Sequence, residues 1–298
     1  MDQGSPFPWQ SRPLVGSVFT SAESLRVAAA CVLRPSDVIV CTFMKTGTTW
    51  LQQVCEQLRT GGNMDFSEIT EVQPWLEQAW DCGQDLDADQ RAAPRLFKSH
   101  NHLTAINPGA KYITIVRDPE KTLLSVYSFL KAKGRPGVVE TDNVNEYAST
   151  GHFADNNFYD GNMFQFYSEL WLAKDLPNVL VLCYEAMMAN PRSHIQRIAT
   201  FMGLDCDERL LDTVEEMSSM EYMKEHDDQF NDNFLARKQA ELGRAKFSTS
   251  VTTKVGLSAN QILSEESKQW LRQMWHDQVE AATGLQSYEE MAAKLQMS

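Results

Sequence analysis

The 298-residue chain has few basic side chains, no long apolar run and no paired cysteine motif. Lysine and arginine number 27 against 40 aspartates and glutamates, which gives a formal net charge of −13. This acidity argues against a broad surface for nucleic acid or for an anionic membrane, although a small anion could still bind in a local basic pocket. Hydrophobic residues make up 43% of the chain, an ordinary globular composition that argues against wholesale disorder.

The six cysteines lack the spacing of a zinc site or a redox pair, and several lie in apolar runs, as buried free thiols do. A reducing compartment is the simplest interpretation. The longest purely apolar stretch, residues 27–33, is far too short to span a bilayer. The N-terminus also lacks the basic flank and apolar segment of a signal peptide. We therefore expect a soluble, cytoplasmic protein that binds neither nucleic acid nor membrane.

Three short β-rich runs, residues 37–43, 112–116 and 179–184, are each followed by a helical pattern. Near-continuous apolar runs of this length are typical of strands buried on both faces. Asp118-Pro119 and Asn190-Pro191 indicate helix starts, because a capping side chain precedes proline at the first helical position. The alternation predicts one α/β domain over residues 1–298, with a central parallel sheet flanked by helices.

The C-terminal third is mostly helical in pattern. Residues 207–225 predict one or two helices, and Ser264 is a suitable N-cap for a late amphipathic helix. Residues 226–262 carry few regular signals. A long irregular stretch inside a compact domain is usually a functional loop or a lid, and we expect one there.

The turn after the first run carries the strongest functional signal. It reads Met-Lys-Thr-Gly-Thr-Thr-Trp over residues 44–50 and leads from a strand into a helix. Gly47 lets the backbone approach a ligand, the helix N-terminus offers unpaired N–H groups, and Lys45 supplies charge. Capping would need only one of the three hydroxyls, so the turn predicts a phosphate site. It is not a Walker A loop, in which lysine follows the second glycine, and this disfavours a standard P-loop nucleoside triphosphatase.

This turn resembles the K-[ST]-G-T-T-W signature of the cytosolic sulfotransferases, and further motifs follow in that family's order. The resemblance implies 3′-phosphoadenosine 5′-phosphosulfate (PAPS) as co-substrate, adenosine 3′,5′-bisphosphate as product and no metal. It also places residues 1–35 as an extension on the substrate side and residues 226–262 as a lid or donor-binding loop. The donor-binding residues of the signature are Lys45, Thr46, Gly47, Thr48, Thr49 and Trp50.

Other donor-binding positions follow from the same resemblance. Arg117 and Ser125 have the separation of the family's 3′-phosphate pair, and an always-charged fork plus a hydroxyl suits a phosphate. Tyr184 begins a Y-E-x-M element and, with Trp50, is expected at the adenine. Ser218 and Met220 resemble a [TS]-S-F element, with methionine in place of phenylalanine.

The segment Lys98-Ser99-His100 resembles the family's K-[TS]-H and is predicted in a loop between the first and second runs, where an α/β sheet places its crevice. The family's histidine is the general base, because a neutral imidazole can take a proton from a hydroxyl or an amine. His102 is a neighbouring alternative. The implied reaction is in-line transfer, with Lys45 and Lys98 stabilising developing negative charge.

The chain departs from the family at the C-terminal element R-K-G-x-x-G-[DE]-W. The nearest match is residues 251–256, which contain Lys254 but no Arg-Lys pair. The missing charge could come from Lys254 or from a rearranged loop that contains Arg237-Lys238, Arg244 or Lys246. The family's dimerisation motif is absent as well, so the oligomeric state stays open.

The acceptor is expected to be a small molecule bound by loops around residues 70–90, 135–160 and 226–250. These loops are rich in aspartate, so a cationic or amine-bearing acceptor is a possible consequence, although acidic loops are usually just solvated. Two other functions compete with sulfuryl transfer. One is a P-loop-like small-molecule kinase, and the other is a non-catalytic nucleotide-binding relative. The aspartates concerned are Asp81, Asp85, Asp87, Asp89, Asp142, Asp155, Asp160, Asp227 and Asp228.

Overall fold

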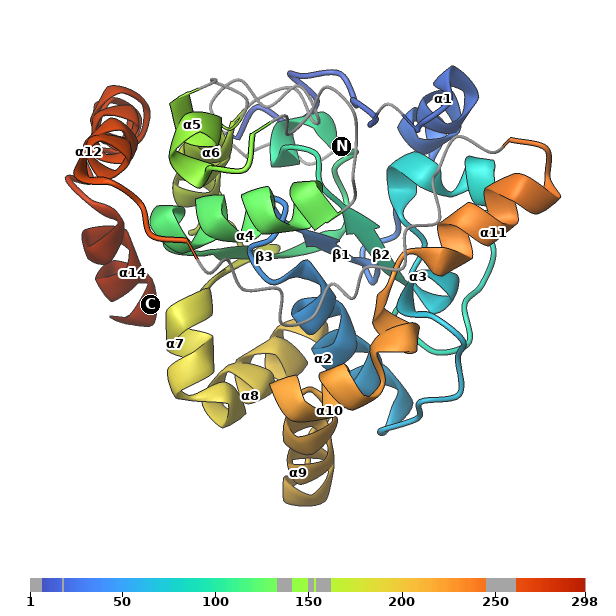
Figure 1. Cartoon of the computed structure of the whole chain (residues 1–298). Coiled ribbons are helices and arrows are strands. Elements are labelled where there is room, and N and C mark those ends of the chain that lie inside the picture. Colours follow the sequence, from blue (N-terminus) through green and yellow to red (C-terminus); the bar gives the residue numbers. More distant parts are fainter. Residues whose placement is uncertain are drawn as a thin grey trace.

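A four-stranded parallel sheet forms the centre of the chain, with the strand order β2-β1-β3-β4 (Figure 1). The computed structural model describes residues 7–17, 19–132, 141–149, 153, 162–244 and 261–297. The three predicted strands are confirmed, because the structure contains β1 (Val38–Cys41), β3 (Lys111–Val116) and β4 (Val179–Cys183). The chain is thus a single α/β domain with a parallel sheet, as the alternation of patterns predicts.

The fourth strand, β2 (Leu96–Ser99), corrects the sequence prediction. Lys98 and Ser99 were expected in a loop, yet they pair in register with Val40 and Cys41 of β1. The two polar side chains at the end of this short strand conceal its apolar character. Because all four strands are parallel, the ends of β1 and β2 open at the same edge of the sheet, where ligands bind in open α/β folds.

Successive side chains of β1 point into two different hydrophobic cores. Val38 and Val40 belong to one cluster, and Ile39 and Cys41 belong to the other, as the alternation of a strand requires. The first core is covered by α2 (Thr48–Thr60), α8 (Pro191–Met202) and α9 (Glu208–Met217). The second lies under α4 (Pro119–Ala132) and α6 (Met163–Ala173) on the opposite face (Figure 1).

The predicted helix starts are confirmed by their caps. The Asp118 carboxylate accepts a hydrogen bond of 2.8 Å from the Glu120 N–H at the start of α4. The Asn190 side chain accepts one of 3.3 Å from the Ser193 N–H at the start of α8. Each bond satisfies an N–H group that the helix itself leaves without a partner.

The C-terminal third is mostly helical, as predicted, but residues 226–262 are less irregular than expected. A 3₁₀ helix, η4 (Asp227–Phe230), and α11 (Asn233–Glu241) occupy its first part, while residues 245–260 lie outside the described residues. Ser264 caps the late helix α12 (Glu265–Met274) by accepting a hydrogen bond from the Ser267 N–H, as predicted. The other helical elements are α1 (Ala22–Ala30), α3 (Ile69–Val72), η1 (Leu76–Gln78), η2 (Trp80–Cys82), η3 (Leu103–Ala105), α5 (Val144–Ser149), α7 (Tyr184–Ala189), α10 (Met220–Glu225), the π-helical η5 (Trp275–Glu280), α13 (Ala281–Thr283) and α14 (Tyr288–Met297).

None of the helices in the described ranges is both long enough and apolar enough to cross a membrane.

Candidate active site

The turn between β1 and α2 has an unusual backbone. Lys45 has a φ of +63°, which is rare for a residue other than glycine, and Gly47 has a φ of +123°. An Arg117 Nη1–H group donates a hydrogen bond of 2.9 Å to the Lys45 carbonyl. Arg117 follows the end of β3, so the neighbouring strand holds the turn in its strained conformation.

The hydroxyls of this turn differ in their availability. Thr46 donates its hydroxyl to the Phe43 carbonyl at 2.7 Å, so it does not donate to a ligand in this arrangement. The Thr48 hydroxyl lies 2.5 Å from that of Thr42. The N-terminus of α2 receives no capping bond from its N-cap side chain, because that residue is Gly47. Its first N–H groups and the half-buried Thr49 are therefore suited to an anion.

Three of the predicted donor-binding side chains gather beside this turn. The Arg117 guanidinium carbon lies 4.4 Å from the centre of the Tyr184 ring. The Tyr184 and Trp50 rings are 5.5 Å apart at 71°, an edge-to-face arrangement. A methyl group added to Gly47 would come within 3.0 Å of the Tyr184 ring. The loop and the predicted adenine-binding tyrosine are thus in close contact.

Gly47→Ala is therefore expected to disturb both the backbone and the Tyr184 contact. We expect a loss of about 1–3 kcal/mol in the free energy of unfolding and weaker binding of adenosine 3′,5′-bisphosphate. Urea unfolding and calorimetric titration measure the two effects. Gly61→Ala, at the left-handed end of α2, is the matched control, since its new methyl group meets no described atom within 4 Å. If both variants bind the nucleotide like the parent, Gly47 has no specific role at the ligand.

Lys45 lies against α4, the helix that carries Ser125. The Lys45 ammonium lies 4.7 Å from the centre of the Phe129 ring. Phe129 is one helical turn after Ser125, whose side chain is half-buried. The structure therefore brings the loop lysine to the helix that carries the predicted phosphate-binding serine.

Of the remaining residues predicted to bind the donor, Ser218 follows α9, Met220 begins α10, and Lys254 is not among the described residues. Ser218 donates its hydroxyl to the Val214 carbonyl at 2.6 Å, and Met220 begins α10 with 43% of its surface exposed. An amide N–H of Gln53 in α2 donates to the Met217 carbonyl at 2.9 Å, which ties this segment to the helix of Trp50. Lys254 lies outside the described residues, so its predicted contact stays a prediction.

His100 is held in one tautomer at the end of β2. Its Nδ1 lies 2.8 Å from the carbonyl oxygen of Thr42, which can only accept, so Nδ1 carries the hydrogen. In this neutral tautomer Nε2 carries no hydrogen, so it can accept a proton. Because the Thr42 hydroxyl contacts Thr48, one residue joins the predicted base to the turn that is predicted to bind phosphate.

Lys98 is almost fully buried beside this histidine. It is 3% exposed, and its ammonium lies 4.0 Å from the centre of the Trp75 ring. The same indole lies 5.2 Å from the His100 ring at 89°. Trp75 therefore contacts both residues of the predicted catalytic segment, and no motif in the sequence indicated it.

His102 has a different environment from His100. Its Nδ1 donates to the Glu169 carboxylate at 2.9 Å, and its ring packs against Phe166. Glu169 also accepts from the backbone N–H groups of Leu103 and Thr104. The carboxylate thus joins α6 to the start of η3, and His102 is part of that structural link.

The buried carboxylate of Glu77 is hydrogen-bonded to the end of β2 and to the residues that follow it. Glu77 accepts hydrogen bonds from the Ser99 hydroxyl and the Asn101 amide. Burial raises its pKa, and these two bonds oppose the rise. The Asn101 side chain also pairs with the Val15 N–H and carbonyl at 2.8 and 2.9 Å, so the N-terminal segment lies beside the site. Neither residue stood out in the sequence, because these partners are far apart along the chain.

Several of the carboxylates predicted on the acceptor side already have hydrogen-bond or ion-pair partners within the protein. Asp81 accepts from the Ser21 N–H and hydroxyl, Asp89 pairs with Arg34, and Asp142 pairs with Lys131. Asp155 and Asp160 lie outside the described residues. These three carboxylates are bound to side chains or backbone groups of the protein itself, so they do not add support for a cationic acceptor.

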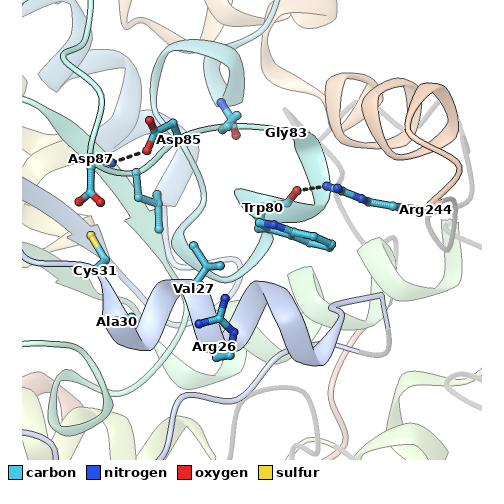
Figure 2. A pocket seen from close by; sticks show the side chains of 11 residues that line it. Arg26, Val27, Ala30, Cys31, Trp80, Gly83, Asp85, Asp87 and Arg244 are labelled. Atoms are coloured by element: carbon cyan, nitrogen blue, oxygen red, sulfur yellow. Dashed lines mark hydrogen bonds between the residues drawn. The ribbon is translucent and has the colours of Figure 1, made fainter.

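A pocket of about 500 Å³ lies between α1 and residues 80–87 (Figure 2). Asp85 and Asp87 of the loop predicted for the acceptor line it, whereas, apart from the candidate Arg244, its lining includes none of the described residues predicted for catalysis or for donor binding. Arg244, one candidate for the missing basic pair, lies at its edge. Its guanidinium carbon is 3.5 Å from the centre of the Trp80 ring, and it donates a hydrogen bond to the Trp80 carbonyl. In this arrangement Arg244 is part of the pocket wall.

Comparison with known proteins identifies the family. Residues 35–282 match the sulfotransferase domain family. Sulfotransferase 1C2 of Rattus norvegicus is 27% identical over 204 residues, which cover 65% of this chain and 67% of that protein. Sulfotransferase 1A1 of Mus musculus is 28% identical over 232 residues, which cover 74% and 76%. The chain belongs to the sulfotransferase family, and its resemblance to the cytosolic sulfotransferases is confirmed.

Solved structures agree on the fold. Retinol dehydratase in complex with androsterone and the inactive cofactor PAP has a TM-score of 0.67 at 16% identity and covers 91% of this chain and 89% of its own. Mouse sulfotransferase SULT7A1 complexed with PAP has a TM-score of 0.65 at 17% identity and covers 95% of both chains. These likenesses show that the chain has the α/β fold of these proteins. Its membership of the sulfotransferase family makes it an enzyme of the sulfuryl-transfer class.

Proposed function

We propose that this protein transfers the sulfuryl group of PAPS to a hydroxyl or an amine of a small-molecule acceptor. The observation that carries the proposal is the position of Thr42. Its carbonyl orients the His100 ring, and its hydroxyl contacts Thr48 in the first turn of α2. A base that is ready to accept a proton therefore lies next to a helix N-terminus suited to a phosphate or sulfate group.

The residues of the turn fit a nucleotide that carries two anionic ends. One N–H of Arg117 is used by the Lys45 carbonyl, and a guanidinium has four others for a phosphate. Tyr184 and Trp50 provide aromatic surface near this guanidinium. The uncapped start of α2 supplies N–H groups for the second anion. PAPS would supply the activated sulfuryl group at this place.

The chain's own residues then account for the transfer step. The His100 Nε2 removes the proton of the acceptor hydroxyl or amine, whose lone pair attacks sulfur in line with the leaving phosphate. The S–O bond to the phosphate breaks, and the electron pair leaves with adenosine 3′,5′-bisphosphate. Lys45 stabilises charge on the bridging oxygen and Lys98 on the sulfuryl oxygens, so positioning and electrostatics provide the catalysis.

Two measurements test this function. Calorimetric titration compares adenosine 3′,5′-bisphosphate with ATP, and a transfer assay follows label from PAPS to a pooled library of acceptors. We expect the bisphosphate to bind far more tightly than ATP and label to appear in at least one acceptor. Preferential binding of ATP would favour the small-molecule kinase. Binding of the bisphosphate without transfer to any acceptor would favour a non-catalytic relative.

Arg117→Ala is expected to weaken binding of adenosine 3′,5′-bisphosphate about 10- to 100-fold, since it removes a charged hydrogen-bond donor. Arg117→Lys keeps the charge but loses the planar fork, so its affinity should be intermediate. Titration calorimetry gives both constants. An unchanged dissociation constant for Arg117→Ala would remove this residue from the donor site.

The proposal extends to the acceptor and to the location of the protein. A cationic or amine-bearing acceptor is part of it, and screening neutral, anionic and cationic acceptors tests it directly. A cytoplasmic location is supported by the family and by the six cysteines, all of which are free thiols. The lid or donor-binding role of residues 226–262 and the substrate-side position of residues 1–35 are also part of this proposal.

A further inference from the structure

Trp75 lies at the meeting point of the predicted catalytic segment and α11. It is 6% exposed and precedes η1, where its backbone forms an isolated parallel bridge with Lys98. The Lys98 N–H donates to the Pro74 carbonyl at 2.9 Å, so the backbone before η1 is anchored to β2. The position of the indole is therefore set by the strand whose side chains it contacts.

The indole contacts two residues with assigned roles. The Lys98 ammonium lies 4.0 Å from its centre, and the His100 ring stands perpendicular to it at 5.2 Å. A buried ammonium needs a compensating partner, and the face of tryptophan is the strongest aromatic partner for a cation. The Thr42 carbonyl holds one edge of the His100 ring, and the indole limits the rotation of that ring about this bond.

Helix α11 supports the indole from another side. Phe234 and Leu235 share one buried cluster with Trp75. The helix is fastened near both ends: the Phe234 N–H donates to the Glu68 carboxylate at 2.5 Å, and the Gln239 amide donates to the Gln78 side chain at 3.1 Å. Leu235 is fully buried, so it can act on the site only through its packing.

We infer that Trp75 is a positioning residue of the transfer reaction, which holds Lys98 and His100 in their working orientations, and that α11 keeps the indole in place. This inference rests on the proposed function. It assigns the first part of residues 226–262 a specific role, because correct packing of α11 is then a condition for an assembled catalytic segment.

Trp75→Leu tests the inference through a double-mutant cycle with Lys98→Met. We expect Trp75→Leu to lower kcat about 100-fold, since a displacement of about 1 Å can cost that much, while the affinity for adenosine 3′,5′-bisphosphate stays unchanged. In the Lys98→Met background the loss should shrink to about 10-fold or less, because one of the two positioned groups is gone. Leu235→Ala should reproduce a smaller loss of kcat without a change in the acceptor KM.

A readout that does not depend on turnover separates this inference from the proposed function. The ¹⁵N signals of the His100 imidazole, assigned by comparison with His100→Asn, should show hydrogen on Nδ1 in the parent and a mixture of tautomers in Trp75→Leu. Equal losses in both backgrounds, or unchanged His100 signals, would overturn the inference. If Trp75→Leu fails to fold, Trp75→Phe replaces it in the double-mutant cycle with Lys98→Met, with an expected loss of kcat of about 3- to 10-fold. A parent protein that transfers no sulfuryl group would refute the proposed function instead.

Discussion

His100→Ala is expected to lower the rate of sulfuryl transfer by about 10²- to 10⁴-fold, the usual contribution of a positioned general base. The binding of adenosine 3′,5′-bisphosphate should remain close to that of the parent, because the imidazole is held by the Thr42 carbonyl and its proposed role is to deprotonate the acceptor. Steady-state transfer from PAPS and calorimetric titration of the bisphosphate measure the two quantities on the same preparation.

Two variants sharpen this result. His100→Asn can still donate a hydrogen bond but cannot accept a proton at the position of Nε2, so it should be as inactive as His100→Ala. His102→Asn is the matched control, since this neighbouring buried histidine is tied to Glu169. We expect it to lower the free energy of unfolding more than the turnover of folded enzyme. A larger loss of transfer in His102→Asn than in His100→Asn would reverse the assignment of the base.

Lys45→Ala is expected to lower transfer about 10²- to 10³-fold, the range seen when one stabilising donor is removed from a developing charge. The ammonium of Lys45 is the group proposed to stabilise negative charge on the leaving oxygen, and the substitution removes it. Transfer kinetics under saturating PAPS measure the effect, because saturation separates a loss of kcat from a loss of donor affinity.

The positive φ of Lys45 requires its own control. Lys45→Gly also removes the ammonium, but glycine adopts a φ of +63° at no steric cost. We expect Lys45→Gly to be as inactive as Lys45→Ala and Lys45→Arg to keep part of the activity. Recovery of transfer in Lys45→Gly would mean that the conformation of the turn matters and that the charge does not.

The elements predicted best are those whose signal is local. The runs around Ile39, Ile113 and Val181 are almost entirely apolar, which is sufficient to identify strands buried on both faces. Asp118 and Asn190 each precede a proline, and the two caps are observed as expected. The turn that contains Lys45 and Gly47 was found for the same reason, because its whole pattern lies within seven consecutive residues.

The features that were missed depend on contacts between distant parts of the chain. Strand β2 is defined by its pairing with β1, and its polar end made it look like a loop. The bond from Arg117 to the Lys45 carbonyl joins residues 72 positions apart, and the bond from His100 to Thr42 joins residues 58 apart. Trp75 has no motif around it, and its proposed role follows only from the neighbours that the fold brings to it, which are Lys98, His100 and the buried residues of α11.

Arg117 has two roles, one in the conformation of the turn and one in the proposed binding of the nucleotide, and a sequence comparison does not distinguish them. It restrains the backbone at Lys45 and presents the charge proposed for the nucleotide. A protein in which Arg117 is replaced must therefore regain both the restraint on the Lys45 backbone and the affinity for the nucleotide. Single substitutions at this position should seldom survive selection. In a randomised library selected for a new sulfuryl donor, changes at position 117 should therefore be recovered only together with further changes that restrain the backbone at Lys45.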